Sequence, residues 1–256
     1  MGVPTPRSAH AVVTAALRTQ RPGPEHHLLR AHKARLASRD VSELGLRNDV
    51  YRRPLATALE RLRLEPGWTC VDVGAGAGDV AVALAELVEA QGRIYAVDRD
   101  PVRVGEVAQL AAAASHAQVI ALQQDAEELI LPEQVDLAFC RFLLLHVVDP
   151  IRVLRRMGAV TKPGGWVVAQ EPITTAGRVG GHALSMPEAR DADIGAILPA
   201  LVREAGLVLV DAWAEAPAGA GPGPVADYLE ALTDVSPGDD PVVLPPLVTV
   251  LARRPA

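Results

Sequence analysis

From position 71 the chain reads Val71-Asp72-Val73-Gly74-Ala75-Gly76-Ala77-Gly78-Asp79, so an apolar run breaks into three alternating glycines before a helical pattern begins. This order predicts a buried strand, a tight turn and a helix start. Glycine is needed where the backbone takes a positive φ or lies against a ligand. The turn is therefore typical of a nucleotide-binding loop at the carboxyl end of a first strand.

Two acids beside this loop narrow the class of nucleotide. A dinucleotide places its pyrophosphate on the helix N-terminus, where the carboxylates of Asp72 and Asp79 would repel it. The glycines are spaced G-x-G-x-G, whereas the dinucleotide fingerprint is G-x-G-x-x-G. A ligand with a cationic amino acid end suits Asp72 better, which disfavours a nicotinamide dehydrogenase.

A second predicted strand, Arg93–Asp98, ends in an acid at about the separation from the glycines at which a carboxylate can accept both ribose hydroxyls. The loop and this acid together indicate adenosine. With these residues the chain resembles the class I S-adenosylmethionine-dependent methyltransferases, whose loop is written D-x-G-x-G-x-G. The resemblance implies S-adenosyl-L-methionine as cofactor and S-adenosyl-L-homocysteine as product.

The resemblance runs from about Leu64 to Pro172 and continues more weakly at 193–206 and 244–250. It implies a Rossmann-like, doubly wound α/β fold, with a seven-stranded sheet of order 3-2-1-4-5-7-6 whose last strand is antiparallel. Four ordered motifs are more specific than a glycine loop alone. They are the loop, the acid Asp98, the pair Asp125-Ala126 that contacts adenine in the family, and the turn Pro163-Gly164-Gly165.

In such a fold the ligand lies above the carboxyl ends of the strands. The residues expected to bind the cofactor are Asp72, Gly74, Ala75, Gly76, Asp98, Arg99, Asp125, Ala126 and Arg141. An arginine directly after a buried strand is costly unless it is paired. Arg141 therefore either forms a salt bridge with Asp72 or Asp125, or binds the cofactor carboxylate through its planar fork, and the family favours the second interpretation.

The expected chemistry is direct displacement of the sulfonium methyl by an O, N or C nucleophile, for which proximity supplies roughly 7 to 11 kcal/mol without a base. His146, which follows the fourth strand, is the leading candidate for a base because its ordinary pKa is near neutrality. Its alternative is a polar residue that starts the next helix. Glu171, at the end of the fifth strand, is the second candidate, and its alternative is an acid that closes the pocket rim or binds a backbone N–H.

We expect three parts of the chain: a flexible arm over residues 1–24, an amino-terminal helical cap over 25–63 and a methyltransferase domain over 64–256. In the resembling family such a cap folds over the cofactor as a lid. The cap helices are expected at His26–Ala37 and Pro54–Leu64, with a break at Asp40–Leu44.

Substrate contacts are expected from the cap and from two insertions. Tyr51 and Arg52 lie in the part of the cap that would approach the site, although capping and solvent-facing roles are open for both. The insertions are 173–190, whose glycines suggest mobility and which carries His182, and 215–243. Because these segments depart most from the family pattern, the sequence does not name the substrate.

Composition excludes several classes of partner. A net charge of −6 and few aromatic residues argue against nucleic acid, and no apolar stretch is long enough to span a bilayer. Cys70 and Cys140 fall in predicted strands without a ligand at metal-binding spacing, so two buried thiols and no metal are expected. We expect a cytoplasmic protein with a small-molecule partner, and the resemblance leaves a homodimer open.

The sequence thus predicts a small-molecule methyltransferase, of the kind found in specialised-metabolite and antibiotic biosynthesis. That last step rests on resemblance and on an Ala-, Val-, Arg- and Pro-rich composition. One alternative is an S-adenosylmethionine-binding enzyme of this fold that catalyses a cyclisation, rearrangement or elimination without methylation. Another is a partner subunit that has lost cofactor binding, against which the intact loop and Asp98 argue.

Overall fold

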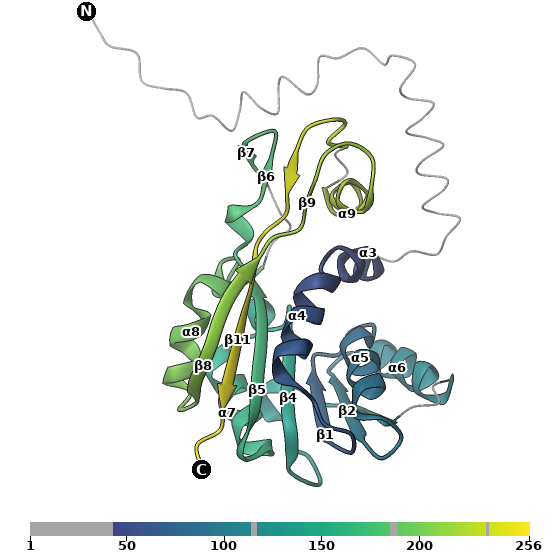
Figure 1. Cartoon of the computed structure of the whole chain (residues 1–256), viewed down its shortest axis with the longest axis vertical. Coiled ribbons are helices and arrows are strands. Elements are labelled where there is room, and N and C mark those ends of the chain that lie inside the picture. Colours follow the sequence, from purple (N-terminus) through teal and green to yellow (C-terminus); the bar gives the residue numbers. More distant parts are fainter. Residues whose placement is uncertain (1–42, 114–116, 185–188, 234–235) are drawn as a thin grey trace, which may run out of the picture. The chain divides into compact units, whose positions relative to one another are not determined.

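The computed structural model describes residues 43–113, 117–184, 189–233 and 236–256, all within one compact unit that spans Glu43–Ala256 (Figure 1). The expected arm over residues 1–24 and the expected helix at His26–Ala37 lie outside the described residues. Within the described part, no helix is long and apolar enough to cross a membrane, and no cluster of side chains could hold a metal ion.

A seven-stranded sheet forms the centre of the unit, in the order β3-β2-β1-β4-β5-β11-β8. The first five of these strands are parallel, whereas β11 is antiparallel to both of its neighbours. The predicted order is therefore confirmed. The strands are β1 Thr69–Val73, β2 Arg93–Asp98, β3 Gln118–Gln123, β4 Val135–Arg141, β5 Thr161–Pro172, β8 Val208–Glu215 and β11 Leu247–Arg253.

Helices cover both faces of this sheet and create two hydrophobic cores (Figure 1). Alternate residues of a strand enter opposite cores, as the two-residue period of a strand requires: Cys70 packs with α4 and α5, whereas Val71 and Val73 pack with α7 and α8. Both cysteines are buried and free, as predicted. The helices are α4 Arg52–Leu62, α5 Asp79–Val88, α6 Pro101–Ala113, α7 Pro150–Val160 and α8 Ile194–Glu204.

The two insertions pair with each other in a second, four-stranded sheet of order β7-β6-β10-β9. Strand β10 is antiparallel to β6 of the first insertion and to β9 of the second. The second insertion also contains a helix, α9, which spans Pro224–Thr233. The small strands are β6 Arg178–Val179, β7 His182–Ala183, β9 Ala218–Gly219 and β10 Val242–Val243, and a 3-10 turn, η3, spans Thr174–Ala176.

Helix α3, Glu43–Val50, was not predicted. The expected break at Asp40–Leu44 is wrong for its last two residues, Glu43 and Leu44, because they begin this helix. Its hydrophobic pattern is weak, with Leu46 as its buried residue, and it packs against α9 from a distant part of the sequence. Tertiary packing rather than local periodicity therefore stabilises α3.

Candidate functional site

The glycine loop after β1 has the backbone geometry that its sequence predicts. Gly74, Gly76 and Gly78 all have positive φ, at 75°, 53° and 89°. The N–H groups of Gly74 and Ala75 donate to the carbonyl of Val97 at 2.7 and 2.9 Å, which draws the loop against the end of β2. A Cβ on Gly74 would lie 2.8 Å from Cδ1 of Leu143, so the loop is also close to the chain that follows β4.

Substitution of Gly74 by alanine is expected to lower the free energy of unfolding by about 1 to 3 kcal/mol, because alanine would be strained at this φ and would collide with Leu143. Urea denaturation checks this value. Gly105→Ala is the matched control, since a Cβ there meets nothing within 4 Å inside α6 and is expected to stabilise by about 0.5 to 1 kcal/mol. Equal stability of Gly74→Ala and the wild type would contradict the strained loop.

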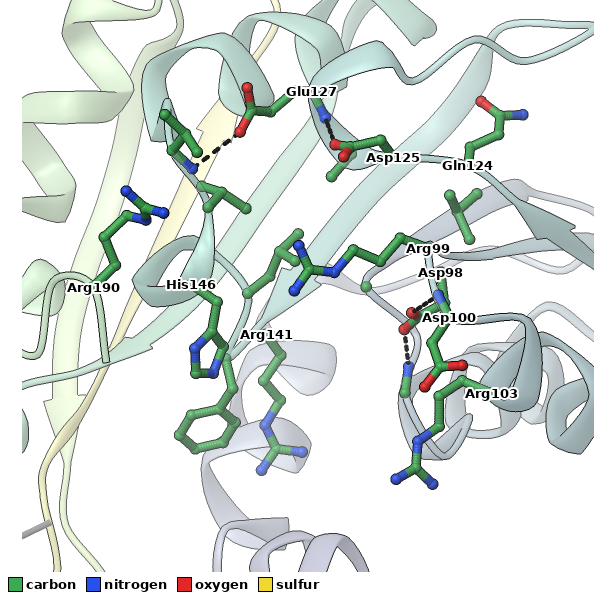
Figure 2. A pocket seen from close by; sticks show the side chains of 18 of the residues that line it. Asp98, Arg99, Asp100, Arg103, Gln124, Asp125, Glu127, Arg141, His146 and Arg190 are labelled. Atoms are coloured by element: carbon green, nitrogen blue, oxygen red, sulfur yellow. Dashed lines mark hydrogen bonds between the residues drawn. The ribbon is translucent and has the colours of Figure 1, made fainter. Parts of the chain in front are cut away.

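Asp98 lies at the end of β2 and fixes the tip of the glycine loop. Its Oδ2 accepts the N–H of Gly76 at 2.8 Å and its Oδ1 accepts the N–H of Asp100 at 2.9 Å. Figure 2 shows both bonds beside the cavity. Each carboxylate oxygen has a further lone pair, so the side chain can accept hydroxyl groups from a ligand as well.

A cavity of about 350 Å³ lies over the carboxyl ends of β1, β2 and β4, at the lower end of the usual range for small-molecule sites. Asp125, which follows β3, caps the short 3-10 turn η1, Ala126–Glu128, by accepting the N–H of Glu127 at 2.8 Å. Of the residues predicted from sequence, the cavity is lined by Gly74, Gly76, Asp98, Arg99, Asp125, Ala126, Arg141 and His146.

Asp72 and Ala75, also predicted for the cofactor, do not line this cavity. Asp72 is 2% exposed and lies on the α5 side of β1, because it alternates with Val71 and Val73. Burial raises its pKa to about 7, opposed by the N–H of Ala81 and by Arg141, and its Oδ2 has no partner among the described residues. Ala75 packs against the core beneath the loop.

The sequence of this region matches a known family. The sequence profile described as "Methyltransferase domain" matches residues 71–169, which include the glycine loop, Asp98, Asp125 and Arg141. Residues 71–169 are therefore similar to a methyltransferase domain. Sequence, strand order and the placement of the loop agree on this conclusion.

Several known proteins resemble the methyltransferase domain. The chain is 34% identical over 116 residues to a demethylmenaquinone methyltransferase of Geobacillus kaustophilus, which covers 44% of this chain and 49% of the relative. It is 35% identical over 102 residues to a ubiquinone biosynthesis O-methyltransferase of Xanthomonas campestris, covering 39% and 41%. The matches thus span about half or less of these relatives' length.

A solved structure shares the fold. It is a SAM-dependent methyltransferase from Aquifex aeolicus, which superposes with a TM-score of 0.56 at 18% identity and covers 78% of this chain and 88% of the other. At this identity the likeness is one of fold.

Arg141, at the end of β4 in the methyltransferase domain, is 7% exposed and points toward α4 (Figure 2). Its Nη2 donates to the carbonyl of Tyr51 at 2.7 Å. Among the described residues it forms no ion pair, so of the two alternatives the salt bridge to Asp72 or Asp125 does not match the structure. Burial lowers its pKa to about 10, which leaves a cation at neutral pH, and its Nε lacks a partner in the described chain. Contact with a cofactor carboxylate stays a prediction.

His146 ends the short 3-10 turn η2, Leu144–His146, and lines the cavity. It does not start the next helix: Asp149 caps α7 instead, by accepting the N–H of Arg152. Partial desolvation and the cations Arg47 and Arg99 lower the pKa of His146 below its ordinary 6.5. The imidazole is therefore neutral at neutral pH and able to accept a proton.

Glu171 does not line the cavity. It is fully buried, and it lies on the same face of β5 as Val167 and Ala169, which pack with α7 and α8. Its Oε1 accepts the N–H groups of Leu143 at 2.9 Å and Leu144 at 2.7 Å. The interpretation of Glu171 as an acid that binds backbone N–H groups matches this geometry, and the proton-accepting one does not. Glu171 holds the turn that carries Phe142, whose φ is 51°, and His146.

Glu171 should also make stability depend on pH. Burial raises its pKa to about 7 in the folded protein, whereas an unfolded glutamate titrates near its ordinary value of 4.5. The folded state keeps the proton to higher pH, so the contribution of Glu171 to stability falls as pH rises from about 4.5 to 7. The free energy of unfolding of Glu171→Gln, measured by urea denaturation, is expected to rise relative to that of wild type by on the order of 2 kcal/mol from pH 5 to pH 7.5. Glu60→Gln, an exposed change on α4, is the control, and parallel pH curves for wild type and Glu171→Gln would contradict the protonated acid.

The three predicted substrate residues lie in different places. Tyr51 is buried, and its hydroxyl donates to the carbonyl of Pro245 at 2.9 Å. It lines a second, smaller cavity. Arg52 and His182 are exposed and line neither cavity, because Arg52 faces outward on α4 and His182 lies in the small sheet.

Several lining residues were missed by sequence reasoning. Gln124 and Glu127 flank the Asp125-Ala126 motif, so the motif itself was the available signal. Arg190 arrives from the first insertion, where its N–H donates to the carbonyl of Leu145 at 3.0 Å. Arg47 had no signal, because it lies on the unpredicted helix α3.

Proposed function

We propose that this protein transfers the methyl group of S-adenosyl-L-methionine to an O, N or C nucleophile of a small molecule. The observation that carries the proposal is the cavity at the end of β1, β2 and β4, where Asp98 and the glycine loop meet within a methyltransferase domain. When bound there, the cofactor supplies a methyl group already activated on a positively charged sulfur.

The residues present fit such a cofactor. Asp98 has free lone pairs for ribose hydroxyls, and Asp125 and Ala126 stand at the place of the family's adenine contact. Arg141 lines the same cavity, and its planar guanidinium group can bind the cofactor's carboxylate through two hydrogen bonds. Asp72 does not line the cavity, and its buried Oδ2 has no hydrogen-bond partner among the described residues.

His146 is the residue we assign as general base. It is neutral at neutral pH and lies on the cavity wall. With a hydroxyl acceptor, His146 would take the hydroxyl proton, and the cofactor, when bound, would supply the methyl group that the acceptor oxygen receives. The matched relatives are named for menaquinone and ubiquinone biosynthesis, which supports a small organic acceptor here. A role in specialised or antibiotic metabolism belongs to the proposal because of the family resemblance and the composition, and a place in the cytoplasm is also part of the proposal.

The test is titration calorimetry with S-adenosyl-L-methionine, S-adenosyl-L-homocysteine and NAD in parallel. Binding of the first two and not of NAD is expected; binding of NAD alone, or of nothing, would overturn the assignment. Product mass in a subsequent acceptor screen distinguishes methyl transfer from a cyclisation, rearrangement or elimination without methylation. The gain of one methyl group indicates transfer, and an altered acceptor with unconsumed cofactor indicates the non-methylating alternative.

A further inference from the structure

A second cavity, of about 130 Å³, lies next to the cofactor cavity and shares Arg47, Phe142 and His146 with it. The remaining walls come from α3, α9, and the segments that follow β5 and precede β11. Because the same three side chains line both cavities, a molecule in the second one lies against His146 and next to the cofactor. Its lining is completed by Glu43, Tyr51, Leu145, Pro172, Thr174, Ala189, Tyr228, Leu232 and Pro245.

Arg47 has no ion-pair partner among the residues that the structure describes. Its Nε is buried and has no hydrogen-bond partner in the described part of the chain. The guanidinium lies 4.5 Å from the centroid of the Phe142 ring. Desolvation lowers its pKa, while Tyr228, Asp79, Glu43 and Glu171 act in the opposite direction. A desolvated cation is costly unless an opposite charge completes it, so this position favours an anionic ligand.

Apart from Glu43, Thr174 and His146, the other walls are aromatic and apolar. The ring of Tyr51 packs edge-on against Phe142 and Tyr228, with centroids 5.1 and 6.3 Å apart. The Tyr51 hydroxyl is already bonded to Pro245, so it presents its ring and not a donor. A dry cavity of roughly 150 Å³ is known to hold benzene, so 130 Å³ is the size of one six-membered ring.

We infer that this second cavity is the acceptor chamber, and that its occupant is a small aromatic ring with an acidic oxygen, a carboxylate or a phenolate, held by Arg47. The inference rests on the proposed function for the role of the neighbouring cavity. Arg47 is the one arginine or lysine among the described residues that line the chamber, whereas the cofactor cavity is lined by Arg47 and by four further arginines, Arg99, Arg103, Arg141 and Arg190. The anion of the acceptor therefore pairs with Arg47, and its ring lies against Phe142 and Tyr228.

The test uses benzoate and its neutral counterpart benzamide as probes, with binding followed by ligand-observed NMR in the presence and absence of S-adenosyl-L-homocysteine. Wild-type protein is expected to prefer benzoate by about tenfold or more, with or without the homocysteine compound. Arg47→Gln is expected to lose about tenfold to a hundredfold in benzoate affinity, as for a charge-assisted hydrogen bond, and to lose less in affinity for S-adenosyl-L-homocysteine, which has further contacts along the larger cavity. Arg52→Gln, an exposed arginine on the neighbouring helix, is the matched control and is expected to change neither.

Each contrary result has a distinct meaning. Unchanged benzoate affinity in Arg47→Gln, or displacement of benzoate by S-adenosyl-L-homocysteine, would overturn the acceptor chamber. Loss of S-adenosyl-L-homocysteine binding in the folded variant would assign Arg47 to the cofactor instead. Leu232→Trp, which fills the chamber from α9, provides a second variant and is expected to abolish benzoate binding alone. Failure of the wild type to bind S-adenosyl-L-homocysteine would count against the proposed function. The preference for benzoate over benzamide would still be measured, because that comparison is also made in the absence of S-adenosyl-L-homocysteine.

Discussion

Replacement of His146 by alanine is expected to lower turnover by about 10² to 10⁴ for a neutral hydroxyl acceptor, while cofactor affinity stays unchanged. The histidine lies where both cavities meet, so it can reach an acceptor proton in the smaller cavity beside a cofactor in the larger one. The measurement is kcat with an acceptor from the mass screen. His182→Ala, an exposed histidine that lines neither cavity, is the control.

The pH profile separates a base from a structural histidine at position 146. A base must be neutral, and partial desolvation, Arg47 and Arg99 lower the pKa of His146. Turnover of wild type should therefore fall as pH drops through a value below 6.5, and this limb should vanish in His146→Ala. A variant that keeps both the rate and the acid limb would return His146 to a structural role.

Replacement of Asp98 by alanine is expected to weaken binding of S-adenosyl-L-methionine by about 1.5 to 3 kcal/mol, which is roughly tenfold to more than a hundredfold. The variant loses the acceptor for ribose hydroxyls and also the bonds that fix Gly76 and Asp100. Titration calorimetry gives the dissociation constant.

Asp193→Ala provides the matched control for Asp98→Ala. Asp193 also fixes a loop, by accepting the N–H and hydroxyl of Thr175 at 2.9 and 2.7 Å, but it lines neither cavity. Its substitution should affect stability and leave cofactor affinity near the wild-type value. Equal affinities of wild type and Asp98→Ala would remove the ribose assignment.

The sheet and the cofactor cavity could be predicted because their signals are local. The glycine loop, the acid at the end of β2 and the Asp125-Ala126 pair each occupy a few adjacent residues, and parallel strands bring their ends to one edge. The alternation of side chains along β1 explains why Asp72 does not line the cavity. Its place in the motif suggested a wall residue, but every second side chain of β1 points toward α4 and α5.

The smaller cavity could not be predicted, because its walls form only when distant segments pack. Arg47 lies on α3, whose helical pattern is weak and whose position depends on α9, nearly two hundred residues away in the sequence. Asn48, one residue later, donates to the carboxylate of Asp79 at the start of α5, which ties α3 to the glycine loop. Phe142 adopts a positive φ that an aromatic residue rarely takes.

The small sheet has a consequence for changing the specificity of this domain. Strand β10 pairs with β6 on one side and β9 on the other, so each insertion supplies backbone partners for the other. Exchange of one insertion for that of a relative would leave unpaired strand edges, which are aggregation-prone. The insertions 173–190 and 215–243 should therefore be exchanged together. Chimaeras that exchange both insertions are expected to remain soluble, whereas chimaeras that exchange one are expected to aggregate.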